Sequence, residues 1–580
     1  MKWDREPALT GSGDGSSRRR ITRGGFDAMI LAKRVSDTWV ASARSLAMCL
    51  VIAVLLAGGL YGEGTGDEGD TARGAEVVTT AYGPVTGHID NGTWSFKGIP
   101  YAAPPLGELR WRAPQPLVPW SESLAAAEFG PACRQARQTQ IAESEDCLTL
   151  NVWTPFEGPG SKLPVMVWVH GGGSINGSGR AEGHTFARDG VVLVSINYRL
   201  GRLGVFDHPA LAATRPAGEP SANFGTLDQI AALRWVQRNI AGFGGDPDRV
   251  TIFGVSAGGS SVNRLMVSPL AAGLFRGAIA ESGGNGLSVM RRREESGALP
   301  SLFEAGLDFA RATGAADADD VAAALRALPA EEVAPRNTGR TYRGAVSAVV
   351  DGQVIPDDPG KIFSDGGQND AAYIGGANAF EGSLAIAIPA SDAFTVRIAK
   401  YRDRLERLYG VTDDDRRLAL EVYGDVFFHA PTRYLVTQSA KSGRRSWRYR
   451  FEYVVESMRA TFDRARHGGE VPFVFDALPP GGLTLSPGRA AAVGVGVGTY
   501  PISSADLAMA RTIHDQWIRF AETGDPNGPG LPVWPPSTGE NDVTLVFAGA
   551  GVSAQTDLYQ ERLDFIEGQV RPWPAPLPPE

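Results

Sequence analysis

The sequence predicts an α/β protein with a mostly parallel central sheet and helices on both faces, and three observations support this. Short runs of β-branched and aliphatic residues at 165–169, 191–196, 250–253 and 277–280 have the composition of strands buried on both faces. Between the second and third runs, apolar residues within 227–240 recur at spacings of three and four, which indicates a helix with one packed face. Strands that alternate with helices are typical of parallel sheets.

Composition indicates one large globular domain. The chain has 580 residues, of which 43% are hydrophobic and 21% charged, close to the averages of folded proteins. We expect a single domain over 75–580, with helical insertions that form a cap-like subregion. The formal net charge of -9 argues against nucleic-acid partners, which require clustered basic residues to neutralise phosphates.

The first 60 residues have the features of a targeting segment. Residues 46–57 form an apolar stretch that follows basic residues and precedes small ones, so 1–60 are predicted to be an N-terminal extension with a signal peptide. Residues 61–74 have the composition of a solvated linker. Secretion is therefore expected, with a retained membrane anchor as the alternative. The anchor is disfavoured because a membrane span needs about 20 apolar residues.

A candidate nucleophile follows the third predicted strand. Residues 254–258 form a G-x-S-x-G pentapeptide that holds Ser256 on a sharp turn between the strand and a helix. The pentapeptide is weak evidence alone, because the chain contains 72 glycines. The preceding context strengthens it: the glycine run 171–173 follows the first predicted strand, where backbone N–H groups can approach a developing oxyanion. The alternative interpretation of that run is a flexible loop.

A serine nucleophile needs a base and an acid, and in this type of fold the chain order is serine, acid, histidine. Three histidines follow Ser256, namely His429, His467 and His514. His514 lies in a predicted helix, and His429 is placed to cap a turn. His467 follows a predicted strand at 449–454 and precedes two glycines, so an exposed loop imidazole is expected there. Chemical reasoning alone leaves all three histidines as candidates for the base, and it does not select the acid.

Several further segments resemble one known family. They occur in one order over roughly 75–545, which makes coincidence an inadequate explanation. The segments are 96–102, 145–148, 197–199, 223–225, 228–229, 351–352, 375–382, 467–468 and 524–527. With these motifs the chain resembles the type B carboxylesterases, the cholinesterase-like branch of the α/β-hydrolase superfamily.

The resemblance implies specific roles for residues of this chain. It favours His467 as the base and selects the acid within 375–383. The implied set is Ser256, Glu381 and His467 as catalytic triad, Gly172, Gly173 and Ala257 as oxyanion-hole donors, and Ser282 as a hydrogen-bond partner of the acid. It also implies a disulfide between Cys133 and Cys147. The third cysteine, Cys49, lies in the apolar stretch, so the predicted domain contains only this pair. The alternative is that both are unpaired, buried thiols.

The expected function is that of a secreted serine carboxylesterase that hydrolyses uncharged esters of small molecules through an acyl-enzyme. Many family members carry Glu before the nucleophile, whereas this chain has Val255, and residues 134–146 lack the tryptophan that would stack a choline group. No zinc, EF-hand or C-x-x-C pattern is present, so no metal or cofactor is expected. The alternatives are a lipase for longer acyl chains and a catalytically inactive adhesion or interaction protein.

Overall fold

The computed structural model describes residues 76–570 except 137–139, 156–157, 297–299, 335–346, 387–397 and 486–496. All described residues belong to one compact unit, Leu50–Glu580. The predicted signal segment and linker lie outside them. Within the described ranges, none of the helices has both the length and the apolar character needed to cross a bilayer.

A single 13-stranded sheet organises the chain. Its centre is parallel, in the order β9, β8, β10, β11, β12, β13, β16, which confirms the predicted mostly parallel sheet. These strands are β8 (Leu163–Val169), β9 (Val192–Ile196), β10 (Gly245–Val255), β11 (Gly277–Glu281), β12 (Ala372–Asn378), β13 (Ser446–Phe451) and β16 (Val543–Ala548). The four strand runs predicted from composition are β8 to β11. The later strand, predicted at 449–454, is β13 and ends earlier, at Phe451.

Antiparallel strands extend both edges of this sheet. They are β1 (Glu76–Thr79), β2 (Pro84–Asp90), β3 (Thr93–Pro100) and β7 (Thr149–Thr154) at one edge and β17 (Gly551–Thr556) at the other. The short β4 (Leu124–Ala125) pairs with β2 in parallel. Two small pairs stand apart, β5 (Ala132–Cys133) with β6 (Glu143–Ser144) and β14 (Leu483–Leu485) with β15 (Gly498–Tyr500).

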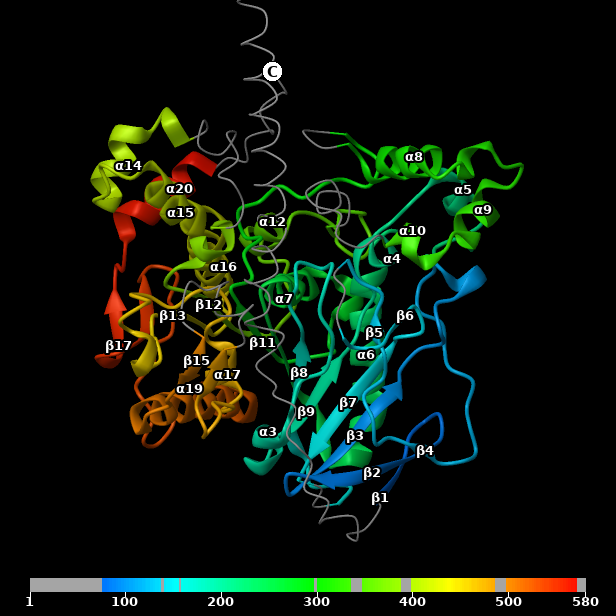
Figure 1. Cartoon of the computed structure of the whole chain (residues 1–580), viewed down its shortest axis with the longest axis horizontal. Coiled ribbons are helices and arrows are strands. Elements are labelled where there is room, and N and C mark those ends of the chain that lie inside the picture. Colours follow the sequence, from blue (N-terminus) through cyan, green and yellow to red (C-terminus); the bar gives the residue numbers. More distant parts are fainter. Residues whose placement is uncertain are drawn as a thin grey trace, which may run out of the picture. The chain divides into compact units, whose positions relative to one another are not determined.

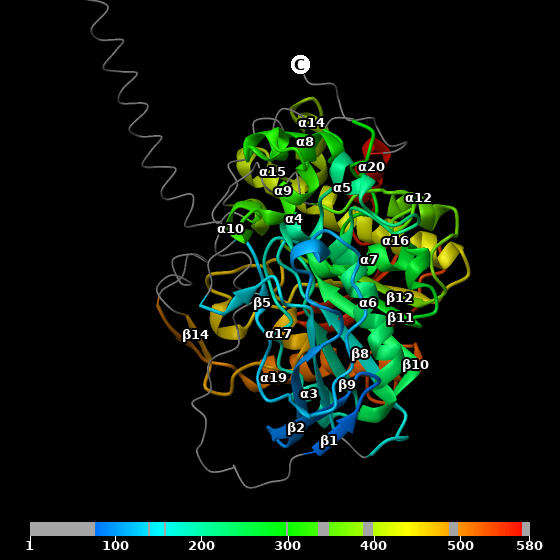
Figure 2. The ribbon, with the colours of Figure 1, turned by 90° about the vertical axis from the view of Figure 1, so that its right-hand side faces the viewer.

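Helices cover both faces of the sheet and bury two apolar cores (Figure 2). One core includes α6 (Phe224–Asn239), α7 (Ala257–Val267), α12 (Pro359–Ser364) and α16 (Ala430–Lys441). The other includes α3 (His184–Arg188), α17 (Val471–Val474) and α19 (Ser504–Thr523). The helix predicted at 227–240 is α6, and its apolar positions Leu227, Ile230 and Leu233 are buried in the first core.

Further helices gather beyond the carboxyl ends of the parallel strands, on the side where α7 begins (Figure 1). They form two groups in this view, and they correspond to the predicted helical insertions. One group contains α5 (Pro209–Ala213), α8 (Leu302–Ala312), α9 (Val321–Ala327) and α10 (Ala330–Val333), close to the short α4 (Gly201–Gly204); the other contains α14 (Arg402–Tyr409), α15 (Asp415–Gly424) and α20 (Gln560–Val570).

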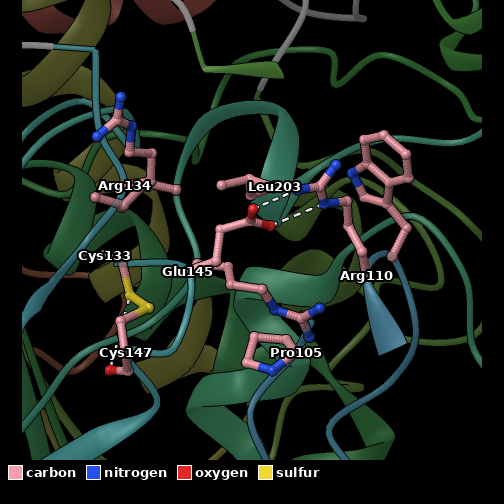
Figure 3. A pocket seen from close by; sticks show the side chains of 10 residues that line it. Pro105, Arg110, Cys133, Arg134, Glu145, Cys147 and Leu203 are labelled. Atoms are coloured by element: carbon pink, nitrogen blue, oxygen red, sulfur yellow. Dashed lines mark hydrogen bonds and ion pairs between the residues drawn. A yellow bond between two sulfur atoms is a disulfide. The ribbon is translucent and has the colours of Figure 1, made fainter. Parts of the chain in front are cut away.

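A disulfide joins Cys133 and Cys147, which are separated by 14 positions (Figure 3). Beside it the guanidinium of Arg110 donates from Nε to Glu145 Oε2 at 2.9 Å and also bonds Glu145 Oε1. Both side chains are largely buried. The disulfide and the ion pair together fix the segment between β5 and β7 against the rest of the domain.

Loss of the disulfide is expected to destabilise the fold. Replacing both Cys133 and Cys147 with Ser removes the constraint on the unfolded chain, which for a loop of this length is worth about 3 kcal/mol. The midpoint of urea unfolding should fall in the double variant, and reductant should lower it in the wild type alone. Equal midpoints for both proteins, with and without reductant, would contradict a stabilising role.

Candidate active site

Ser256 occupies a sharp turn between β10 and α7. Its φ of 59° lies in the left-handed region, which a serine adopts at a cost that the surrounding structure must offset. Its N–H donates to the carbonyl of Glu281 at 2.8 Å, which ties the turn to the neighbouring strand. A Cβ at Gly254 or Gly258 would lie 2.4 or 2.0 Å from the carbonyl oxygen of Val169, so this strained turn requires glycine on both sides.

Near this turn, the backbone amides of Gly172, Gly173 and Ala257 donate no hydrogen bond within the described part of the chain. Gly172 and Gly173 follow β8 with φ of 108° and 68°, a conformation that favours glycine. Ala257 is the first residue of α7, where N–H groups carry the positive end of the helix dipole. Within the described residues, all three N–H groups are thus free to donate to a bound group.

His170 anchors the glycine loop. Its Nδ1 lies 2.8 Å from the carbonyl of Gly171, its ring stacks on Tyr198 with centroids 4.4 Å apart, and its own carbonyl accepts from the Tyr198 hydroxyl at 2.7 Å. Burial lowers the pKa of His170 to about 4. This imidazole is therefore neutral at physiological pH and acts as a rigid support for the loop.

Four neighbouring parallel strands bring the remaining predicted residues to one edge of the sheet. Ser256 directly follows β10, Ser282 follows β11, Glu381 lies just beyond β12, and His467 lies in the segment after β13. Because the carboxyl ends of parallel strands meet at the same edge, residues up to 211 positions apart in the chain, from 256 to 467, converge there.

Glu381 and His467 are in direct contact. The His467 Nδ1 bonds Glu381 Oε2, and both side chains are almost fully buried, with relative exposures of 5% for His467 and 1% for Glu381. The other carboxylate oxygen, Oε1, accepts from Ser282 Oγ at 2.6 Å and from the Asn378 backbone N–H at 2.7 Å. The backbone N–H of His467 donates to Ser383 Oγ at 3.0 Å, which fixes the chain as well as the ring.

These contacts shift the ionisation of both partners. Burial by itself raises the pKa of Glu381, but the charge and hydrogen bond of His467, with the bonds from Ser282 and Asn378, hold it below its ordinary value. Burial likewise lowers the pKa of His467, and the Glu381 carboxylate more than offsets this, so the net shift is upward. A carboxylate that stays ionised beside an imidazole stabilises the imidazolium that forms during catalysis.

The second nitrogen of His467, Nε2, is buried and has no hydrogen-bond partner among the residues that the structure describes. The structure shows no hydrogen bond between it and Ser256 Oγ; bonds of this kind often tighten only when substrate binds. The expectation of an exposed loop imidazole is wrong, because Glu381 and the ring of Phe428, with a centroid 5.1 Å away, cover His467. Ser256 is half-buried.

The other two candidate histidines lie elsewhere, His514 fully buried and His429 half-buried. His514 Nδ1 lies 2.7 Å from the carbonyl of Val474, and its Nε2 lies 3.1 Å from Asp189. That carboxylate precedes Ser256 in the chain and also bonds Arg188 and Arg511, which indicates a structural cluster. His429 has Nε2 3.1 Å from Arg450 and belongs to a π-helical turn before α16. Neither histidine contacts Glu381.

Two buried carboxyl groups near this contact were missed in the sequence. Glu470, three residues after His467, accepts from Asn378 Nδ2 at 2.5 Å and lies 3.4 Å from Ser282 Oγ. Burial and the charge of Glu381 raise the pKa of Glu470 to about 7. Burial and Glu470 together raise the pKa of Glu281, whose Oε1 accepts from Trp517 Nε1 at 2.8 Å. The signal that could have identified Glu470 in the sequence was its position close to the segment His467-Gly468.

Comparison with known proteins agrees with this geometry. The model of the carboxylesterase family matches residues 74–409 and 410–566. The fumonisin B1 esterase of Sphingopyxis macrogoltabida is 34% identical over 79% of this chain and 84% of its own length, and the para-nitrobenzyl esterase of Bacillus subtilis is 33% identical over 81% and 94%. Among solved structures, a PNB esterase superposes with a TM-score of 0.70 and 29% identity over 85% of this chain and 99% of its own.

Glu470→Gln is expected to move the acid limb of the pH profile of kcat/KM for ester hydrolysis to lower pH. The ionised Glu470 helps to raise the pKa of His467, so removing its charge lets the imidazole lose its proton at lower pH. Rates measured with a p-nitrophenyl ester from pH 5 to 9 would show this shift.

The matched control for this measurement is Glu281→Gln. Glu281 is equally buried, but its charge does not contribute to the shift of His467, so the acid limb should stay in place. An unchanged or upward-shifted limb in Glu470→Gln would contradict the coupling between Glu470 and His467.

Proposed function

The chain belongs to the carboxylesterase family and is a carboxylic ester hydrolase, and on this premise we propose that it is a secreted serine esterase that acts on uncharged esters through an acyl-enzyme on Ser256. The observation that carries the proposal is the buried contact of Glu381 with His467, whose second imidazole nitrogen has no partner in the described part of the chain. A base held in this way, at the same sheet edge as a serine on a strained turn, fits nucleophilic acyl transfer.

In the proposed reaction His467 Nε2 removes the proton of Ser256 as Oγ attacks the ester carbonyl. The negative charge that develops on the carbonyl oxygen is stabilised by the amides of Gly172, Gly173 and Ala257, which make no other hydrogen bond within the described residues. The protonated imidazole then gives its proton to the leaving alkoxide, and the acyl group stays on Ser256.

In the second half of the reaction His467 takes a proton from water, and the resulting hydroxide attacks the acyl-enzyme. Collapse of this second tetrahedral intermediate releases the carboxylic acid and returns the proton to Ser256. Glu381 stays ionised throughout because its four hydrogen-bonding contacts favour the charged form, and it keeps Nδ1 of His467 protonated.

The surroundings of Ser256 support uncharged rather than cationic substrates. Val255 is buried directly before the nucleophile and offers no charge. In the segment after Cys133, Glu145 is bonded to Arg110 and Glu143 is paired with Arg134, so these carboxylates are already neutralised. A quaternary ammonium group would find no tryptophan to stack on between Cys133 and Cys147.

Secretion is part of the proposal. The disulfide between Cys133 and Cys147 would persist in an oxidising compartment, and the apolar stretch 46–57 has the length of a signal-peptide core. Both features are consistent with export.

Ser256→Ala is expected to lower kcat for p-nitrophenyl esters by roughly 10⁴-fold or more, because it removes the only nucleophile of the proposed reaction. Esters from acetate to decanoate should be tested, since an optimum at the long end would favour the lipase alternative. Ser260→Ala, on the same helix and also half-buried, is the matched control and should retain activity. Equal rates in Ser256→Ala and the wild type, or no activity in either, would contradict the proposal.

A pair of isosteric substrates tests the charge preference. Butyrylcholine and 3,3-dimethylbutyl butyrate have the same shape but differ by one positive charge. Without a cation-π partner to offset the cost of desolvating the ammonium group, the neutral ester should have the higher kcat/KM, by roughly tenfold. Comparable values for both, or a preference for the cation, would contradict an uncharged substrate class.

A further inference from the structure

A cavity of about 110 Å³ lies directly beyond the proposed base, next to Gly468 and Gly469. Its walls come from the segment between β13 and α17, from α17 itself and from the chain that leads to β14. They are mainly apolar and include Tyr453, Met458, Phe462, Phe473, Leu478 and Leu483. None of the residues that we assign to the catalytic reaction lines it.

Two arginines line this cavity, and they differ in their partners. Arg464 is paired with Glu421 at 2.7 Å and also lies 3.4 Å from Asp463. Arg466, which immediately precedes His467, makes no side-chain hydrogen bond and no ion pair with any residue that the structure describes. Its guanidinium lies 4.3 Å from the ring centroid of Phe462. Among the described residues, the acid that acts on its charge is Asp463, and this exposed carboxylate already contacts Arg464.

Arg466 is half-buried, and its partly desolvated guanidinium forms no ion pair with a described residue, so an opposite charge beside it would be favourable. Burial accordingly lowers the pKa of Arg466 from its ordinary value, although the group stays protonated. A carboxylate would restore the balance, since it forms two charge-assisted hydrogen bonds with the planar guanidinium. The apolar walls would accept the hydrocarbon part of the same molecule.

We propose that this cavity, defined by Arg466 and the apolar residues around it, binds a short apolar monocarboxylate, the acid product of the enzyme's own reaction. The assignment as product rests on the proposed function. An uncharged ester and water give an acid, an alcohol and, at neutral pH, a proton released from the acid to solvent. The ester carries no full charge for Arg466, whereas the acid, with a pKa near 4 to 5, is an anion. The cavity thus distinguishes product from substrate.

The volume limits the length of the ligand. An engineered apolar cavity of about 150 Å³ admits benzene, so the smaller volume here suits a short hydrocarbon chain. Hexanoate and its neutral isostere hexanamide are suitable probes, because they differ in charge and hardly in size.

Binding is best measured in the Ser256→Ala protein, where no turnover occurs, by calorimetric titration with hexanoate and hexanamide. Hexanoate should bind more tightly than hexanamide, and Arg466→Gln in this background should weaken hexanoate binding about tenfold or more while hexanamide binding is unchanged. Arg459→Gln is the matched control, because Arg459 lies near Tyr453 but is paired with Glu456. Equal affinities for the two probes, or no effect of Arg466→Gln, would overturn the site.

Wild-type kinetics distinguish a product from an unrelated anion. Hexanoate should inhibit hydrolysis of p-nitrophenyl butyrate, and Arg466→Gln should relieve this inhibition while retaining activity without hexanoate. Hexanoate that binds but does not inhibit would overturn the product assignment. If hexanoate binds in an Arg466-dependent manner but the wild type hydrolyses no ester, the proposed function has failed and the anion site stands. If the wild type hydrolyses esters but shows no Arg466-dependent binding of hexanoate, the anion site has failed and the proposed function stands.

Discussion

The buried contact between Glu381 and His467 is the interaction on which the account depends. A carboxylate and an imidazole in an almost fully buried site are each destabilised by the loss of water, and they persist because each favours the charged form of the other. Ser282 and the backbone of Asn378 complete the hydrogen bonds of the carboxylate. The imidazole is thereby held in one tautomer and one orientation, as a general base requires.

The parallel sheet provides the precision that this contact needs. The predicted nucleophile, the acid, the base and the serine that supports the acid follow four adjacent strands, so the hydrogen-bonded register of β10 to β13 sets their spacing. The turn at Ser256 stores strain that the close packing of Gly254 and Gly258 against Val169 must offset. Beyond the sheet edge the helical insertions lie in two groups, on the side of the sheet where α7 begins.

Sequence reasoning identified the features encoded locally. The strands, helix α6 and the turn at Ser256 follow from short-range composition and glycine placement. The identity of the catalytic acid does not follow from local sequence, because many carboxylates lie between Ser256 and His467. Only the resemblance to a family selected Glu381. The burial of His467 was predicted wrongly, because the ring that covers it, Phe428, is distant in sequence. The sequence also could not show that Arg466 has no ion pair with a described residue, because ion pairing depends on the folded chain.

The most direct test of the central claim is a double-mutant cycle on hydrolysis of a p-nitrophenyl ester, with Glu381→Gln, His467→Ala and the double variant. If Glu381 acts only through His467, the double variant should be no slower than His467→Ala alone, so the two losses should be far from additive. Fully additive losses, or a Glu381→Gln enzyme with wild-type kcat, would contradict the account.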